Sequence, residues 1–163
     1  MPARYNVLFL SNENSDRSIF AEALLNHKGR NRFQAYSAGA KPTGFIYPQT
    51  LRQLELVHLP TAGLRSKGLA EFSKSGAPTM DFVFAICDET AREACPAWPG
   101  WPVTGDWNVP NPILVKGNDE EIEHAFREVF GILQARIDLL VNLRAEGLRD
   151  FSVRRHRQHK RAA

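Results

Sequence analysis

Residues 7–18 read Val7-Leu8-Phe9-Leu10-Ser11-Asn12-Glu13-Asn14-Ser15-Asp16-Arg17-Ser18. The apolar run at 7–10 is typical of a buried strand, and the residues after Ser18 have the spacing of a helix that stops near Gly29. A strand, a polar loop and a helix N-terminus predict an anion site, because the first helical turn leaves backbone N–H groups unpaired and its dipole favours negative charge. Arg17 lies at the junction and can bind a tetrahedral oxyanion through two parallel hydrogen bonds.

The rest of the sequence alternates between strand and helix patterns. Besides the first strand, we expect strands at 32–39, 81–87 and 103–107, and helices at 16–28, 48–57, 69–72 and from 119 to about 147. The continuous apolar run at 81–87 is typical of a parallel strand buried on both faces. A strand, a helix and a returning strand imply a right-handed crossover. We therefore predict an α/β fold, a three-layer sandwich with a central parallel sheet of about four strands flanked by helices.

The composition fits one globular domain. The chain has 163 residues, of which 43% are hydrophobic and 24% charged. We expect a single domain over 1–150 and a basic tail at 151–163, which we interpret as solvated chain, with an anionic partner as the alternative. The net charge of +3 owes much to this tail, so nucleic acid is not the expected partner. No apolar run could span a bilayer and no secretion signal is recognisable, so we expect a cytoplasmic protein without a membrane partner.

Four segments carry the residues suited to chemistry: Ser11 to Ser18, Ser37-Ala38-Gly39, Cys87 to Gly100, and Trp107 to Pro112. Together they resemble the low-molecular-weight protein tyrosine phosphatases and the thioredoxin-coupled arsenate reductases that share their fold. The loop of that family consists of Cys, five residues, Arg, and Ser or Thr. Ser11 stands at the Cys position, whereas Arg17, Ser18 and Asn14 match the family. The resemblance covers residues 6–143 and leans towards the arsenate reductase branch.

The resemblance implies that the loop binds phosphate, arsenate or sulfate. Its anion-binding residues would be Ser11, Asn12, Glu13, Asn14, Ser15, Asp16, Arg17 and Ser18. In the family a thiolate attacks the substrate, whereas a serine hydroxyl is far less acidic and needs an adjacent base. Glu13 or Asp16 could be that base, although each adds negative charge beside the anion. Alternatively, Ser11 only turns the chain after the strand. Glu13 replaces the usual Gly, and its carboxylate competes with phosphate only if it points into the loop.

Cys87 and Cys95 are the second candidate site. In the arsenate reductase branch two such cysteines relay oxidation away from the first Cys, which implies a redox-active pair and a thioredoxin-type reductant as partner. Two buried thiols are the simpler interpretation, since Cys is among the most buried residue types. A metal site is a further alternative, but the spacing is not that of a zinc site and no His lies nearby. We expect neither a metal nor a cofactor.

Asn111 lies between two prolines, where the family has an Asp that acts as general acid. An amide has no titratable proton to give to a leaving group. Asp106 lies nearby in sequence and is a candidate substitute, and an ordinary turn residue is the alternative interpretation of Asn111. The catalytic positions implied by the resemblance are thus Ser11, Arg17 and Asn111, and two of these three are degenerate.

The sequence therefore predicts an arsenate reductase-like or low-molecular-weight tyrosine phosphatase-like protein. It binds an oxyanion or a phosphorylated ligand in the Ser11–Arg17 loop, with lost or much reduced catalysis. One alternative is an active arsenate reductase or phosphatase whose Cys and Asp have been replaced, as is done to trap a substrate. A serine-based hydrolase with Glu13 as base is another, and a non-catalytic protein-interaction scaffold is the last.

Overall fold

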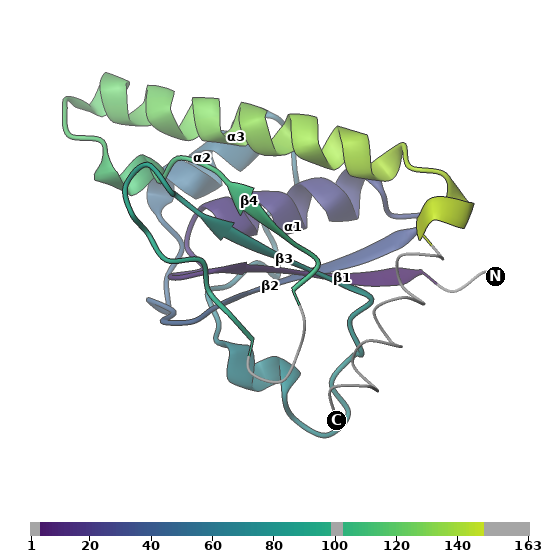
Figure 1. The fold of residues 1–163 in the computed structure, drawn as a ribbon. Helices are drawn as coiled ribbons and strands as arrows, with labels where there is room; N and C mark the ends of the chain where they lie inside the picture. The colour runs from purple at the N-terminus through teal and green to yellow at the C-terminus, as the bar shows by residue number, and fades with distance from the viewer. Residues whose placement is uncertain (1–3, 99–102, 149–163) are drawn as a thin grey trace.

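The computed structural model of the chain describes residues 4–98 and 103–148. Its parallel sheet has the order β2-β1-β3-β4, formed by β1 (Tyr5–Ser11), β2 (Phe33–Gly39), β3 (Phe82–Cys87) and β4 (Gly105–Asn108). On one face lie α1 (Arg17–Lys28), α2 (Pro48–Leu56) and α3 (Asp119–Val141), and on the other lies the 3₁₀ helix η1 (Leu69–Phe72) (Figure 1). A second 3₁₀ helix, η2 (Pro112–Leu114), follows β4. The predicted α/β fold, a four-stranded parallel sheet flanked by helices, is confirmed.

The two central strands of the sheet, β1 and β3, are buried on both faces over most of their length. Val7 and Phe9 of β1 pack towards the three α-helices, whereas Leu8 and Leu10 point to the opposite face. The ring of Phe9 stacks on that of Phe84 in β3, with centroids 5.9 Å apart. Successive side chains of a strand point to opposite faces, so a strand with two buried faces needs a continuous apolar run. This is why β1 and β3 could be recognised from the sequence.

The long helix α3 ends earlier than predicted, at Val141 and not near Gly147. Arg32 was expected to open β2, but it lies just before the strand and its guanidinium donates to the carbonyls of Val141 (2.9 Å) and Leu143 (2.7 Å). The side chain of Asn142 donates to the carbonyl of Asp138 at 2.7 Å. These bonds satisfy carbonyls that a helix end leaves without partners. Residues 145–148 form a further helical turn.

The last strand is shifted from its predicted position at 103–107. It pairs with β3 from Gly105 to Asn108. Thr104 lies outside the strand, and its hydroxyl accepts the backbone N–H of Val83 at 2.8 Å. A side chain thus takes the place of a ladder partner at this point. Smaller differences are that β3 begins at Phe82 and that α2 ends at Leu56.

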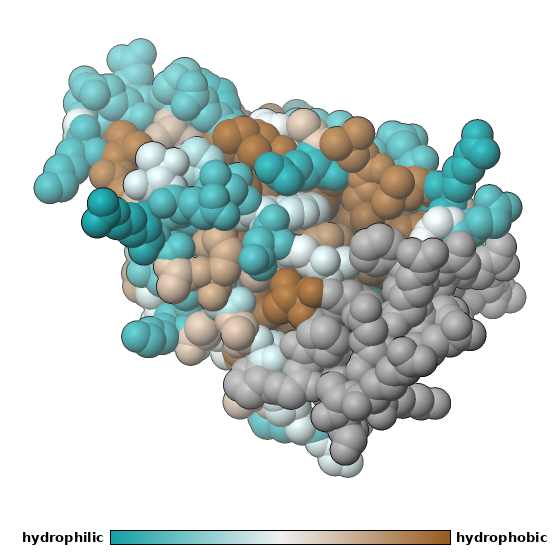
Figure 2. Space-filling model, in the orientation of Figure 1, coloured by the Kyte–Doolittle hydropathy of each residue, from teal (hydrophilic) through white to brown (hydrophobic). Residues whose placement is uncertain are grey.

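On the face seen in Figure 2, hydrophobic side chains gather along α3. Among the exposed large hydrophobic residues of this helix are Ile132 and Leu139. Within the described residues, none of the helices is both long and apolar enough to cross a membrane. The predicted basic tail at 151–163 lies outside the described residues, and the cytoplasmic location stays a prediction.

Candidate functional site

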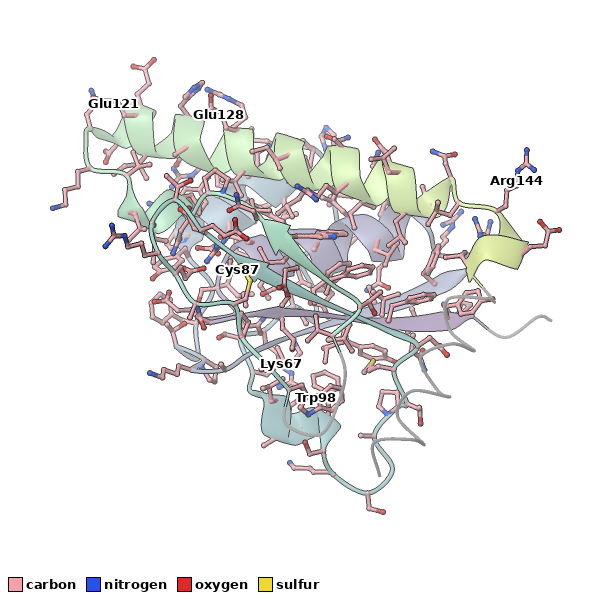
Figure 3. The ribbon with its side chains drawn as sticks, viewed as in Figure 1. Lys67, Cys87, Trp98, Glu121, Glu128 and Arg144 are labelled. Carbon is pink, nitrogen blue, oxygen red and sulfur yellow. A yellow bond between two sulfur atoms is a disulfide. The ribbon has the colours of Figure 1, made fainter. Side chains whose placement is uncertain are left out.

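The loop of residues 11–18 leaves the carboxyl end of β1, the point at which the sheet order reverses. The chain passes from β1 to β2 on one side, and β3 then pairs with β1 on the other. Ligands of open α/β sheets bind at such a switch point, outside the carboxyl ends of the strands. The segment 88–95 follows β3 at this edge, where Figure 3 labels Cys87, and the turn with Asn111 follows β4. The fold thus brings the predicted segments to one edge of the sheet.

Asn14 fixes the shape of the loop. Its φ of 53° lies in the left-handed region, which Asn tolerates better than most residues. The amide of its buried side chain donates to the Ser18 hydroxyl at 2.8 Å and accepts the backbone N–H of Lys67 at 2.9 Å. The Asn14 side chain therefore joins the end of the loop at Ser18 to the neighbouring segment at Lys67.

Gly39, at the end of β2, lets the loop lie close against the sheet. A Cβ at this position would be 2.9 Å from the carbonyl oxygen of Asn12 and 3.0 Å from the Cβ of Asn14. Real Cβ atoms seldom approach other atoms so closely, since side chains pack at van der Waals distances. The Ser37-Ala38-Gly39 match therefore has a steric reason in this chain.

Ser11 is buried, and its hydroxyl bonds within the loop. Its Oγ lies 2.6 Å from the Oγ of Ser18 and accepts the backbone N–H of Asn14 at 3.1 Å. Within residues 4–98 and 103–148, no histidine or carboxylate hydrogen-bonds with this hydroxyl. A serine nucleophile needs such a base. The Ser11 hydroxyl thus takes part in the hydrogen bonds that hold the loop together.

The side chain of Glu13 contacts Tyr47. Its carboxylate accepts a hydrogen bond from the Tyr47 hydroxyl at 3.0 Å, and Tyr47 is the residue before α2. Desolvation, together with this bond and the charge of Glu13, raises the pKa of Tyr47 to about 12. The structure shows no bond between the Glu13 carboxylate and the Ser11 hydroxyl, since Glu13 bonds with Tyr47, and Ser11 bonds with Ser18 and Asn14.

Asp16 caps helix α1. Its carboxylate accepts the backbone N–H of Arg17 and lies 3.5 Å from Nε of the same residue. Burial raises the pKa of this carboxyl, although the charge of Arg17 acts in the opposite direction. In the described part of the chain, no acceptor bonds with the backbone N–H of Glu13, Ser15 or Asp16. These donors are available to an anion at the helix N-terminus.

Arg17 is buried, with 2% of its surface exposed, and its guanidinium has protein partners on each side. Nη1 lies 2.8 Å from Oε1 of Glu93, and Nη2 donates to Oε2 of the same carboxylate at 3.0 Å. Nη1 also donates to the carbonyl of Val109 at 3.2 Å. The bidentate pair with Glu93 has the geometry in which arginine binds planar oxyanions most strongly.

Glu93 is a residue that the sequence reasoning missed, although it lies within the Cys87 to Gly100 segment. Besides Arg17, its carboxylate accepts the side-chain amide of Asn111 at 2.8 Å and the backbone N–H of Asp88 at 3.2 Å. Asp88 in turn accepts the backbone N–H of Asn111 at 2.8 Å. Asp106, the sequence candidate for a substitute acid, is exposed in β4. The structure therefore places Glu93 between two of the predicted catalytic positions, Arg17 and Asn111.

Cys87 and Cys95 form a disulfide with Cα atoms 4.9 Å apart. The interpretation of this pair as two buried thiols is wrong, because the two sulfurs are bonded and Cys95 is partly exposed. The bond closes the segment that carries Glu93. The side-chain amide of Asn12 donates to the carbonyl of Ala94 at 3.1 Å, which links this segment to the loop after β1.

A buried ion pair between Lys67 and Glu22 was also not predicted from the sequence. Lys67 Nζ is 3.9 Å from the Glu22 carboxylate, and both contact the hydroxyl of Ser37. Burial is the largest cause of both pKa shifts: it lowers the pKa of Lys67 and raises that of Glu22. Nothing in the pattern around Lys67 marks it, because a lysine in a connecting segment is usually exposed.

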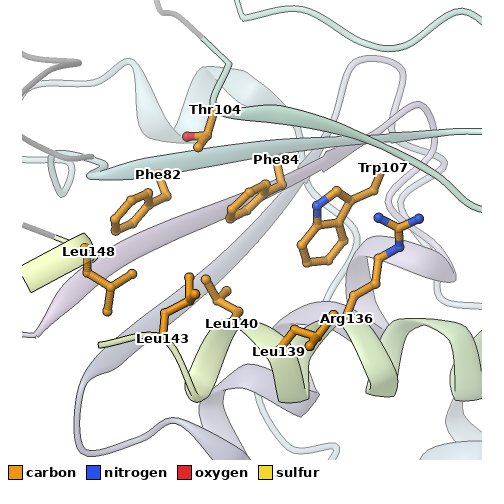
Figure 4. Close-up of a pocket in the computed structure, with 10 residues that line it drawn as sticks. Phe82, Phe84, Thr104, Trp107, Arg136, Leu139, Leu140, Leu143 and Leu148 are labelled. Atoms are coloured by element: carbon orange, nitrogen blue, oxygen red, sulfur yellow. The ribbon is translucent and has the colours of Figure 1, made fainter. Parts of the chain in front are cut away.

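A separate hollow of about 300 Å³ lies between β3, β4 and the end of α3 (Figure 4). Its lining is mostly apolar and includes Phe82, Phe84, Trp107 and Leu148. The guanidinium of Arg136 lies over the Trp107 ring, 5.7 Å from its centroid. The described residues that line the hollow include none of 11–18, so the loop is a different site.

Comparison with known proteins identifies the family. The family model described as low molecular weight phosphotyrosine protein phosphatase matches residues 6–149. The chain belongs to this family. The matched residues include the loop at 11–18. A search of curated protein sequences finds no match.

Solved structures of the family show the same fold. The arsenate reductase from Archaeoglobus fulgidus DSM 4304 is 28% identical, with a TM-score of 0.66, over 84% of this chain and 99% of the other. The thioredoxin-dependent arsenate reductase from Corynebacterium glutamicum is 25% identical, with a TM-score of 0.54, over 83% and 63%. The low molecular weight protein tyrosine phosphatase from T. tengcongensis is 20% identical, with a TM-score of 0.61, over 84% and 97%.

Proposed function

We propose that this chain is a binding member of the low molecular weight phosphatase family. It takes a phosphate-, arsenate- or sulfate-like oxyanion in the loop of residues 11–18 and does not turn it over by the thiolate chemistry of the family. The cytoplasm is its proposed location, and the ligand is the free anion or a phosphorylated molecule that presents it.

The observation that carries this proposal is the set of unpaired donors beside Arg17. The backbone N–H groups of Glu13, Ser15 and Asp16 have no acceptor among the described residues, and they lie at the N-terminus of α1. Helix N-termini of this kind favour negative charge. Arg17 holds a carboxylate in bidentate geometry, which supports its capacity to hold an external oxyanion in place of that carboxylate.

The lack of turnover follows from the residues at the two catalytic positions. Ser11 has a hydroxyl that bonds with Ser18 and Asn14, and no base activates it within the described residues. Asn111 carries an amide that donates to Glu93. An amide cannot protonate a leaving group, and an unactivated hydroxyl is a poor nucleophile at neutral pH.

The test is calorimetric titration of the wild-type chain with phosphate and with arsenate, up to millimolar concentrations, with and without dithiothreitol. We expect saturable binding that Arg17→Ala abolishes. Arg17→Lys is the matched variant, because it keeps the positive charge and loses the two parallel N–H donors of the guanidinium. Its affinity for phosphate should therefore lie between those of wild type and Arg17→Ala. The rate of p-nitrophenyl phosphate hydrolysis should not exceed the rate measured in buffer without protein. Binding that survives Arg17→Ala, or no binding under any of these conditions, would contradict the proposal.

A further inference from the structure

We propose that Glu93 is an internal anion that occupies Arg17, and that the Cys87–Cys95 disulfide holds it there. The oxyanion site is then closed in the oxidised chain and opens when the disulfide is reduced. This inference rests on the proposed function, because it concerns access to the same site.

The first step is the position of the Glu93 carboxylate. It binds Arg17 in bidentate geometry at 2.8 and 3.0 Å, and it also accepts the amide of Asn111 and the backbone N–H of Asp88. Arg17 is buried and the Glu93 side chain is only 15% exposed. Such an ion pair has the same donors and geometry as a bound planar oxyanion. The Glu93 carboxylate therefore occupies the donors of Arg17 as a bound oxyanion would.

The second step is competition. The Nη1 and Nη2 groups of Arg17 are taken by Glu93, and Nε faces Asp16 at 3.5 Å. An added oxyanion needs donors of the same guanidinium, and it meets a carboxylate of like charge at close range. Like charges repel strongly where burial keeps the effective dielectric below that of water. Phosphate therefore binds well only when Glu93 has left Arg17.

The third step concerns the disulfide, which limits the movement of the segment that carries Glu93. Cys87 is the buried last residue of β3, and the disulfide ties it to Cys95 across a sequence separation of 8, so that Glu93 lies inside the closed segment. Most residues from 89 to 94 are exposed. Arg92 has a φ of 58°, a conformation that residues other than Gly seldom adopt without support from the surrounding structure. Without the crosslink the segment gains conformational freedom, and the grip of Glu93 on Arg17 weakens.

The redox step needs a dithiol reductant. One thiolate of the dithiol attacks the sulfur of Cys95, which is the partly exposed partner, and Cys87 leaves as a thiolate. The second thiol of the reductant then resolves the mixed disulfide. Two electrons and two protons pass to the protein, which holds two thiols, while the reductant becomes a disulfide.

The experiment is calorimetric titration with inorganic phosphate of wild type and Glu93→Gln, each oxidised and then reduced with dithiothreitol. Wild type should bind at least tenfold more tightly when reduced, which corresponds to about 1.4 kcal/mol. Glu93→Gln should bind tightly in both states. Cys87→Ser/Cys95→Ser should behave like reduced wild type without any reductant. Hydrogen exchange at the amides of Asp88, Ala91 and Glu93, which are bonded in the closed segment, should accelerate on reduction.

Asp16→Asn is the matched control, because it removes the other carboxylate that faces Arg17. Tighter binding in Asp16→Asn but not in Glu93→Gln would overturn the inference, and so would equal phosphate affinity of oxidised and reduced wild type. If phosphate binds to wild type and Glu93→Gln with the same affinity, the proposed function stands and the role of Glu93 fails. If no variant binds phosphate in either redox state, the proposed function itself fails.

Discussion

The carboxylate of Glu93 binds the guanidinium of Arg17 across 76 positions of the sequence, with its two oxygens 2.8 and 3.0 Å from Nη1 and Nη2. Both groups are largely buried. The arginine that the family resemblance assigns to an external oxyanion thus already has an internal one. The loop and the segment closed by the disulfide therefore form one site around Arg17.

Asp16→Asn should raise the free energy of unfolding at neutral pH by about 1 kcal/mol. Burial raises the pKa of the Asp16 carboxyl in the folded chain above its ordinary value of 3.8. Protonation therefore favours folding, and this contribution is complete below the unfolded pKa and lost as the pH rises through the raised pKa. Asparagine has no charge to bury and is an equally good N-cap. Urea unfolding of both proteins should show a gain at pH 7 that disappears by about pH 3, below the unfolded pKa.

Asp106→Asn is the control for this measurement. Asp106 is exposed in β4, so its substitution should change stability by less than about 0.5 kcal/mol at either pH. A gain for Asp16→Asn that is the same at both pH values would contradict the assignment to a buried charge.

Gly39→Ala should destabilise the chain by about 1–3 kcal/mol, the usual range for overpacking. The new methyl group would lie 2.9–3.0 Å from atoms of Asn12, Glu13 and Asn14, so the loop has to move. Phosphate affinity should fall with it. In α3, Gly131 has open space at its Cβ position, and Gly131→Ala should instead stabilise the helix by about 0.5–1 kcal/mol. Thermal unfolding of the two variants should thus give shifts of opposite sign, and a stabilised Gly39→Ala would show that the loop is not held against the sheet.

The fold could be predicted because its signals are local. The continuous apolar runs of β1 and β3, and the helical spacing before Val141, each identify their element without knowledge of its neighbours. The positions of Asn14 and Arg17 in the loop could be predicted for a related reason, since the loop directly follows β1 and leads into α1. The early end of α3 could not be predicted, because the side chain that binds the carbonyl of its last residue, Arg32, is distant in sequence.

The contacts of the site with distant segments were not predictable in the same way. Glu93 is one of several acidic residues around Cys87, and only the tertiary structure shows that it, and not Glu13, reaches Arg17. The pairing of Lys67 with Glu22 likewise depends on where a connecting segment crosses the sheet. The two partners in each of these ion pairs are 45 or more positions apart in the sequence. Which side chains meet over such a distance depends on tertiary packing, and the periodicity of a single sequence does not predict it.

Lys67→Met should lower the free energy of unfolding by about 3 kcal/mol, because it leaves the Glu22 carboxylate buried without its cation. The double variant Glu22→Gln/Lys67→Met should recover most of this loss. Burial lowers the pKa of Lys67 and raises that of Glu22, so for each group the desolvation of the charged form outweighs the attraction between the two. Urea unfolding of the two single variants and the double variant forms a cycle. A double variant no more stable than Lys67→Met alone would contradict this account.

Ser11→Cys together with Asn111→Asp restores the nucleophile and the acid of the family, yet we expect little phosphatase activity from this double variant when it is oxidised. The carboxylate introduced by Asn111→Asp would replace an amide that donates to Glu93 at 2.8 Å, so two carboxylates would meet beside Arg17. Such a pair shares a proton, or the new carboxylate moves away, and in either case Glu93 stays on the guanidinium while the disulfide holds its segment. Adding Glu93→Gln removes the second carboxylate, and hydrolysis of p-nitrophenyl phosphate should then rise at least tenfold, or about 1.4 kcal/mol in transition-state stabilisation. Glu13→Gln is the matched control, because the Glu13 carboxylate contacts Tyr47 and not Arg17, and it should give no such gain. If Ser11→Cys/Asn111→Asp is fully active without the change at Glu93, then Glu93 does not compete for Arg17.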